Sequence, residues 1–131
     1  MIPVVFDCGV VLSAIGWTGN PRRCLYLVAQ RKVRLCATLE IWEEYERIIP
    51  AQLSRKRPGV NARPTLDWLL TVAHFVNAVP LGKQRSRDLK DDPYLAGALG
   101  ANAKLLVSND RDLLDLQKLL ASPSSRLSSC F

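Results

Sequence analysis

The chain has little of what marks a secreted, membrane-spanning or zinc-binding protein. It has one histidine and four cysteines in 131 residues, and no two cysteines form a C-x-x-C pair. A zinc site or a disulfide scaffold is therefore not indicated, and we expect the cysteines in apolar stretches to be buried thiols. No apolar run approaches the roughly 20 residues of a membrane span, and no basic segment precedes the first apolar run. We expect a cytoplasmic protein with no membrane contact.

Acidic residues are also scarce. The chain has 12 of them against 18 lysines and arginines, which gives a net charge of +6. This surplus favours polyanionic partners, because lysine and arginine displace counterions from phosphates, although it can also serve solubility alone. The length suits a single domain, 1–131, with its core at about 2–115 and a polar tail at about 122–131.

Short apolar runs alternate with segments of helical spacing. The runs at 2–6, 33–37 and 104–107 are rich in Val, Ile and Leu, as are strands buried on both faces of a parallel sheet. A weaker strand is expected at 77–81, which contains Pro80. Helices are expected at about 10–15, 21–31, 40–49, 65–75, 93–100 and 111–120, with Asn20, Thr38 and Thr65 as N-caps and Pro50 as a stop. The alternation predicts a parallel α/β sandwich.

The few acidic residues are placed in a pattern. Asp7 ends the first apolar run, and Glu44 lies in the helix after the second. Two further groups head the last two predicted helices: Asp88, Asp91 and Asp92, then Asp110 and Asp112. Because the carboxyl ends of parallel strands share one edge of a sheet, these carboxylates are expected to converge there. Such a cluster in a basic protein indicates a site for a hard divalent cation.

Three blocks of the chain resemble the PIN domain family, metal-dependent ribonucleases that include the toxins of bacterial toxin–antitoxin pairs. Residues 4–14 are similar to the family's first strand and its hydrophobic-Asp-Thr-Asn-Val-Leu-x-Ser-Ala motif. Residues 38–45 resemble a second block, in which Ser or Thr opens a helix and a Glu projects into the site. Residues 88–114 resemble the D-x-x-D-D-P run that continues to L-V-S-x-D-x-D-L-L. The resemblance implies a three-layer α/β/α sandwich around a mostly parallel sheet of four or five strands.

The resemblance also implies the roles of residues. Metal binding and catalysis fall on Asp7, Glu44, Asp91 and Asp110, with Mg²⁺ or Mn²⁺ as the cofactor. Such an ion would activate a water for in-line attack on an RNA phosphodiester. Neighbouring second-shell contacts are expected from Asp88, Asp92, Asp112 and Ser108. A small antitoxin partner and a homodimer are implied by the resemblance alone.

Candidate contacts to single-stranded or structured RNA come from the basic residues. They are Arg22, Arg23, Arg55, Lys56, Arg57, Arg85 and Arg87, each of which can also be a solvated surface charge. Trp17, in a loop, is a candidate for stacking on a base. The only histidine, His74, is expected on an apolar helix away from the acidic blocks.

Other interpretations stay open. Each acidic residue could instead cap a helix, hold a turn or lie on a solvated helix face. Cys8-Gly9 replaces the family's Thr-Asn, which favours a PIN-like module with impaired catalysis that binds RNA or protein. The run from Val5 to Val10 also resembles the F-D-x-D-G motif of haloacid-dehalogenase-like phosphatases, but Gly9 stands where that chemistry needs a second acid.

Overall fold

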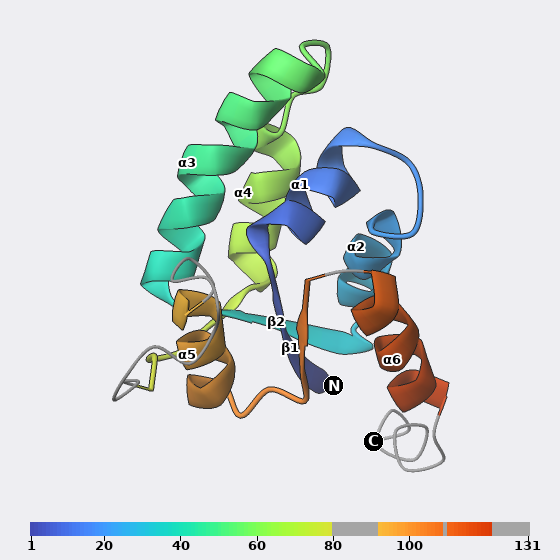
Figure 1. Cartoon of the computed structure of the whole chain (residues 1–131), viewed down its shortest axis with the longest axis vertical. Coiled ribbons are helices and arrows are strands. Elements are labelled where there is room, and N and C mark those ends of the chain that lie inside the picture. The colour runs from blue at the N-terminus through green and yellow to red at the C-terminus, as the bar shows by residue number, and fades with distance from the viewer. Residues whose placement is uncertain (80–91, 109, 122–131) are drawn as a thin grey trace.

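A parallel sheet of four strands forms the centre of the molecule. The structure is a computed structural model that describes residues 1–79, 92–108 and 110–121 (Figure 1). The strands are β1 (Ile2–Phe6), β2 (Val33–Ala37), β3 (His74–Phe75) and β4 (Leu105–Val107), in the spatial order β3-β2-β1-β4. Every neighbouring pair is parallel. This confirms the expected α/β architecture with a parallel sheet.

Helices connect and flank the strands. They are α1 (Cys8–Gly16), α2 (Arg22–Ala29), α3 (Leu39–Lys56), α4 (Arg63–Val72), α5 (Asp92–Gly100) and α6 (Asp110–Ala121). Helix α5 packs against β1, β2 and β4, whereas α2 packs on β2 and α6 on β4. Within the described part of the chain, no helix combines the length and the apolar character needed to cross a membrane.

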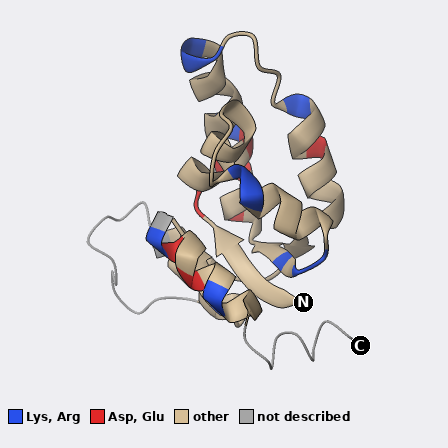
Figure 2. Cartoon of the chain, turned by 90° about the vertical axis from the view of Figure 1, so that its right-hand side faces the viewer, with Lys and Arg blue, Asp and Glu red and all other residues tan. Residues whose placement is uncertain are grey.

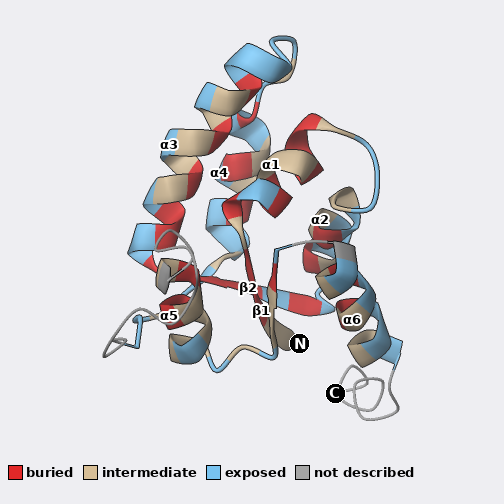
Figure 3. Cartoon of the chain, viewed as in Figure 1, coloured by how far each residue is buried: buried red, intermediate tan, exposed pale blue. Residues whose placement is uncertain are grey.

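Strand β1 lies inside the sheet, between β2 and β4. Val4, Val5 and Phe6 are all buried, as the continuous apolar run predicts (Figure 3). Val4 is in register with Leu35 of β2, and Phe6 with Val107 of β4. Cys8, Cys24 and Cys36 are buried free thiols, which confirms that prediction; Cys130 lies outside the described residues.

The topology brings several helix starts to one edge of the sheet. Strands β1 and β4 are parallel, so α1 and α6, which follow them, both begin at the carboxyl edge. Helix α5 precedes β4 and runs back along the sheet, so that its first residues lie at the same edge (Figure 1). This edge is where the acidic blocks were expected to meet.

The predicted stop at Pro50 is wrong. Helix α3 continues through Pro50 to Lys56, with Pro50 inside it. Proline removes one backbone hydrogen bond and disfavours a helix interior. Here, Ile49 and Leu53 on either side of it are buried in the core, so tertiary packing outweighs the local preference.

Two predicted helix starts need correction. The residue before α2 is Pro21 and makes no side-chain cap, so Asn20 is not the N-cap. Helix α4 begins at Arg63 rather than at Thr65, and the Oδ1 of Asn61 accepts a hydrogen bond from the Arg63 backbone N–H at 3.0 Å.

The third strand also differs from the prediction. It comprises His74 and Phe75, which pair with Cys36 and Ala37, and not residues 77–81. His74 is therefore an exposed strand residue and does not belong to a helix. Residues 77–79 follow the strand as coil, and residues 80–81 lie outside the described residues.

Candidate functional site

Asp7 is held firmly at the end of β1. Its backbone N–H donates to the carbonyl oxygen of Val107 at 2.9 Å, which joins the ends of β1 and β4. Its Oδ1 accepts a hydrogen bond from the Gly9 backbone N–H at 3.0 Å, so Asp7 is the N-cap of α1. The capping interpretation is thus confirmed. It also fixes the half-buried carboxylate at the carboxyl edge of the sheet.

Glu44 is brought to the same edge by α3. The buried Thr38 Oγ1 accepts a hydrogen bond from the Ile41 backbone N–H at 3.1 Å and caps this helix, as predicted. The next residue after Glu44, the fully buried Tyr45, donates its hydroxyl proton to the carbonyl oxygen of Phe6. Phe6 directly precedes Asp7, so this hydrogen bond anchors the Glu44 region of α3 to the end of β1.

Electrostatic effects show that the two carboxylates share one neighbourhood. Burial raises the pKa of the Cys8 thiol from 9.0 to about 12, and the charges of Glu44 and Asp7 add to this shift. The pKa of the Tyr45 hydroxyl is raised by burial, then by Cys8 and by the same two carboxylates. Charges act over short distances in a protein. Asp7 and Glu44 therefore both lie within electrostatic range of Cys8.

Tyr94 is a further member of this neighbourhood. It lies in the first turn of α5 and is only 3% exposed. Burial raises the pKa of its hydroxyl, and Cys8, Tyr45, Glu44 and Asp7 raise it further. Its hydroxyl oxygen is buried and has no hydrogen-bond partner among the described residues. Tyr94 is not among the residues that the sequence predicts for the site.

For the other predicted acidic residues, the structure gives at most the position of the backbone. Asp92 is the first residue of α5 and Asp110 the first of α6, both at the carboxyl edge; their side chains, like Asp91 and Asp88, lie outside the described residues. Among the described side chains, no group of three or more His, Cys, Asp or Glu residues could hold a metal ion. The described donors are Asp7 and Glu44, and Mg²⁺ commonly takes one or two carboxylates.

Ser108 and Asp112 were predicted as second-shell neighbours, and they do contact each other. The Asp112 Oδ2 accepts hydrogen bonds from the backbone N–H of Ser108 at 2.9 Å and from its hydroxyl at 3.0 Å. These bonds tie the residue that follows β4 to the first turn of α6, which begins at Asp110.

Two of the basic residues predicted to contact RNA interact with other parts of the protein. Arg22 donates to the carbonyl oxygens of Ala14 and Ile15 at the end of α1, at 3.2 and 3.4 Å. The guanidinium of Arg57 lies over the ring of Trp17, 5.5 Å from its centroid. Trp17 therefore has one ring face covered by a cation.

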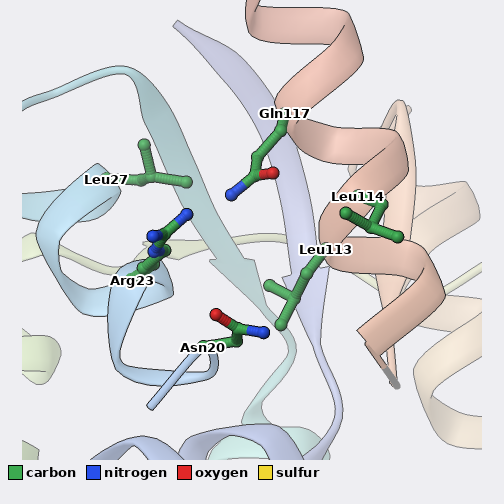
Figure 4. Close-up of a pocket in the computed structure, with 6 residues that line it drawn as sticks. All are labelled: Asn20, Arg23, Leu27, Leu113, Leu114 and Gln117. Carbon is green, nitrogen blue, oxygen red and sulfur yellow. The ribbon is translucent and has the colours of Figure 1, made fainter.

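The remaining described basic candidates are dispersed. Arg55 and Lys56 are exposed in the last turn of α3, roughly 17 Å from Glu44 along the helix axis at 1.5 Å per residue. Figure 2 shows lysines and arginines on several elements, including this far end of α3. Arg23 lines a pocket between α2 and α6 that contains no acidic residue (Figure 4). Arg85 and Arg87 lie outside the described residues.

Comparison with known families agrees with this architecture. The model of the PIN domain family matches residues 3–112, from β1 into the start of α6. The chain therefore belongs to the PIN domain family. Proteins of this family are in general nucleases and typically use divalent metal ions. Neither the curated proteins nor the solved structures contain a match.

Proposed function

We propose that the protein is a divalent-metal-dependent endoribonuclease and the toxin of a toxin–antitoxin pair. The proposal is supported by membership of the PIN domain family and by the charges of Asp7 and Glu44, which both raise the pKa of the Cys8 thiol. Two carboxylates from separate elements at one edge of a parallel sheet suit a hard cation that binds oxygen ligands. The net charge of +6 suits a polyanionic substrate.

The proposal assigns a role to each of the four acidic residues. Asp7 and Glu44 would hold Mg²⁺ or Mn²⁺, together with Asp91 and Asp110, which the family resemblance assigns. The ion would supply Lewis acidity and make a water nucleophilic near neutral pH. Asp7 can keep its position because its Oδ1 is held by Gly9. Glu44 is kept near it by the hydrogen bond from Tyr45 to Phe6.

An RNA cleavage assay with and without EDTA tests this mechanism. Asp7→Asn is the sharpest variant, because asparagine keeps an oxygen that can accept the Gly9 hydrogen bond but loses the charge. Glu44→Gln tests the second carboxylate, and Glu43→Gln is its matched control, since Glu43 is exposed on the same helix. We expect EDTA, Asp7→Asn and Glu44→Gln to abolish cleavage and Glu43→Gln to retain it. Cleavage that persists in EDTA or in Asp7→Asn would refute the mechanism.

The partners belong to the same proposal. A small antitoxin would be encoded beside a toxin gene, so a neighbouring gene for a small DNA-binding protein would support the pairing. Co-expression followed by purification of a complex would test it directly. A homodimer is tested by measuring the mass of the protein in solution.

A second candidate is a PIN-like module with impaired catalysis, which the sequence Cys8-Gly9 favours. The structure leaves space for a side chain at Gly9: an added Cβ would meet only the Asp7 Oδ1, at 4.0 Å. Gly9→Asn restores the family residue and should raise cleavage if the glycine impairs the site. If the purified protein binds no Mn²⁺ by calorimetry, the impaired module is the better description. The phosphatase alternative loses its basis, because the chain belongs to the PIN domain family.

A further inference from the structure

The hydroxyl of Tyr94 is an anomaly in the core. Tyr94 is only 3% exposed, and its hydroxyl oxygen has no hydrogen-bond partner among the described residues. A buried hydroxyl without a hydrogen bond costs free energy, because it has given up its bonds to water. A phenylalanine at this position would keep the packing of the ring and avoid that cost. The hydroxyl therefore needs an explanation other than packing.

The position of Tyr94 indicates which groups could accept a hydrogen bond from its hydroxyl. Helix α5 packs against β1 and α3, the two elements that carry Asp7 and Glu44. Both carboxylates raise the pKa of the Tyr94 hydroxyl, and Glu44 does so more than Asp7. A weak side-chain contact with the Tyr94 hydroxyl also lowers the pKa of the Cys8 thiol, but this contact lacks the geometry of a hydrogen bond, so the hydroxyl has no well-formed partner. The Tyr94 phenol therefore lies near both proposed metal-binding carboxylates.

The two tyrosines of the site differ in one decisive respect. Tyr45 is fully buried, but its hydroxyl is already engaged with the carbonyl oxygen of Phe6. The Tyr94 hydroxyl has a similar neighbourhood and no such engagement among the described residues. A phenol keeps its proton at neutral pH, so Tyr94 remains a hydrogen-bond donor. A neutral donor can stabilise a carboxylate without competing with a cation for it.

We infer that Tyr94 is a positioning residue, whose hydroxyl donates a hydrogen bond to the Glu44 carboxylate when a divalent cation enters the site. This inference rests on the proposed function. One carboxylate oxygen of Glu44 would accept the bond from Tyr94 and the other would face the ion. Hydrogen bonds of this kind orient metal-binding carboxylates and raise metal affinity.

Tyr94→Phe separates this role from a structural one. In the metal-free protein, the variant loses no described hydrogen bond, so its midpoint of thermal unfolding should equal or exceed that of the wild type. Its affinity for Mn²⁺, measured by calorimetry on the full chain, should be weaker by roughly 10-fold. The stabilisation against heat that Mn²⁺ gives should shrink accordingly.

Two further tyrosines serve as controls. Tyr26→Phe removes an exposed phenol on α2 and should change neither stability nor Mn²⁺ affinity. Tyr45→Phe removes a hydroxyl that is already hydrogen-bonded, so it should lower the unfolding midpoint of the metal-free protein.

The outcomes are distinct. Unchanged Mn²⁺ affinity in Tyr94→Phe, or a clearly lower midpoint without metal, would overturn the positioning role and leave the proposed function standing. If the wild-type protein binds no Mn²⁺, the proposed function fails and the role of Tyr94 fails with it.

Discussion

Gly97→Ala tests how closely α5 must approach α3. Gly97 is buried in α5, and an added Cβ would lie 2.6 Å from the Cδ1 of Ile41 and 3.3 Å from the Cγ2 of Thr38. Real Cβ atoms do not come this close to a carbon, so the neighbours would have to move. Ile41 is fully buried, and its side chain has little room to do so.

Two opposing effects set the magnitude. Replacing glycine by alanine within a helix gains about 1 kcal/mol of helix propensity. Overpacking a core position costs about 1–3 kcal/mol. The cost should exceed the gain, so we expect Gly97→Ala to be less stable by about 1 kcal/mol. For a domain of this size, that is a decrease of about 4 °C in the unfolding midpoint.

Ile41→Val should relieve the clash, because it removes the Cδ1 that the new Cβ would meet. Alone, this substitution should cost about 1 kcal/mol for the lost methyl group. In the double variant, the severe clash is gone, the contact with the Thr38 Cγ2 at 3.3 Å needs only a small shift, and the alanine keeps its gain in propensity. Urea denaturation of the wild type, both single variants and the double variant should therefore give a favourable coupling of about 1–2 kcal/mol.

A second glycine variant serves as the control for Gly97→Ala. Gly59→Ala adds a methyl group where nothing lies within 4 Å, and it should have little effect. Free energies of Gly97→Ala and Ile41→Val that add within about 0.5 kcal/mol would refute the contact between α5 and α3. Since α5 carries Tyr94, Gly97→Ala should also weaken Mn²⁺ binding, and Ile41→Val should restore it.

Three further predictions concern a helix cap, a buried thiol and a pair of basic residues. Thr38→Ala should lower the free energy of unfolding by about 1 kcal/mol in urea denaturation, because the N-cap of α3 is lost, whereas Thr38→Ser should keep most of it. Burial raises the pKa of the Cys24 thiol from 9.0 to about 12, so the unfolded chain loses this proton first as the pH rises. Stability should therefore decline above pH 9, by about 1.4 kcal/mol per pH unit for this thiol, and Cys24→Ala should make the decline shallower in urea denaturation at pH 8–10. If Arg55 and Lys56 contact RNA phosphates, replacing both by alanine should weaken RNA binding and reduce its dependence on salt by about one unit of slope per lost contact.

Much of the fold follows from local patterns in the sequence. The apolar run before Asp7 predicts β1, and Thr38 predicts the start of α3 through its cap. The errors occur where distant contacts decide the outcome. Helix α3 passes Pro50 because Ile49 and Leu53 pack in the core. The strand at His74 exists because it pairs with Cys36, and no local preference of its own indicates it.

The sequence predicts the acids of the candidate site, but not the groups that hold them. Strand ends and family order indicate Asp7 and Glu44, and in the structure both charges act on the Cys8 thiol. The hydrogen bond from Tyr45 to Phe6 joins positions 39 residues apart. Spacing within a sequence cannot reveal such a contact. Tyr94 was missed for the same reason, since its environment comes from three separate elements.

The most direct measurement is a crystal of the protein soaked in Mn²⁺, with the ion located by its anomalous scattering. We predict one strong peak at the carboxyl edge of the sheet, in contact with carboxylate oxygens of both Asp7 and Glu44. A peak elsewhere, or none at this edge at a Mn²⁺ concentration that supports RNA cleavage, would contradict the account.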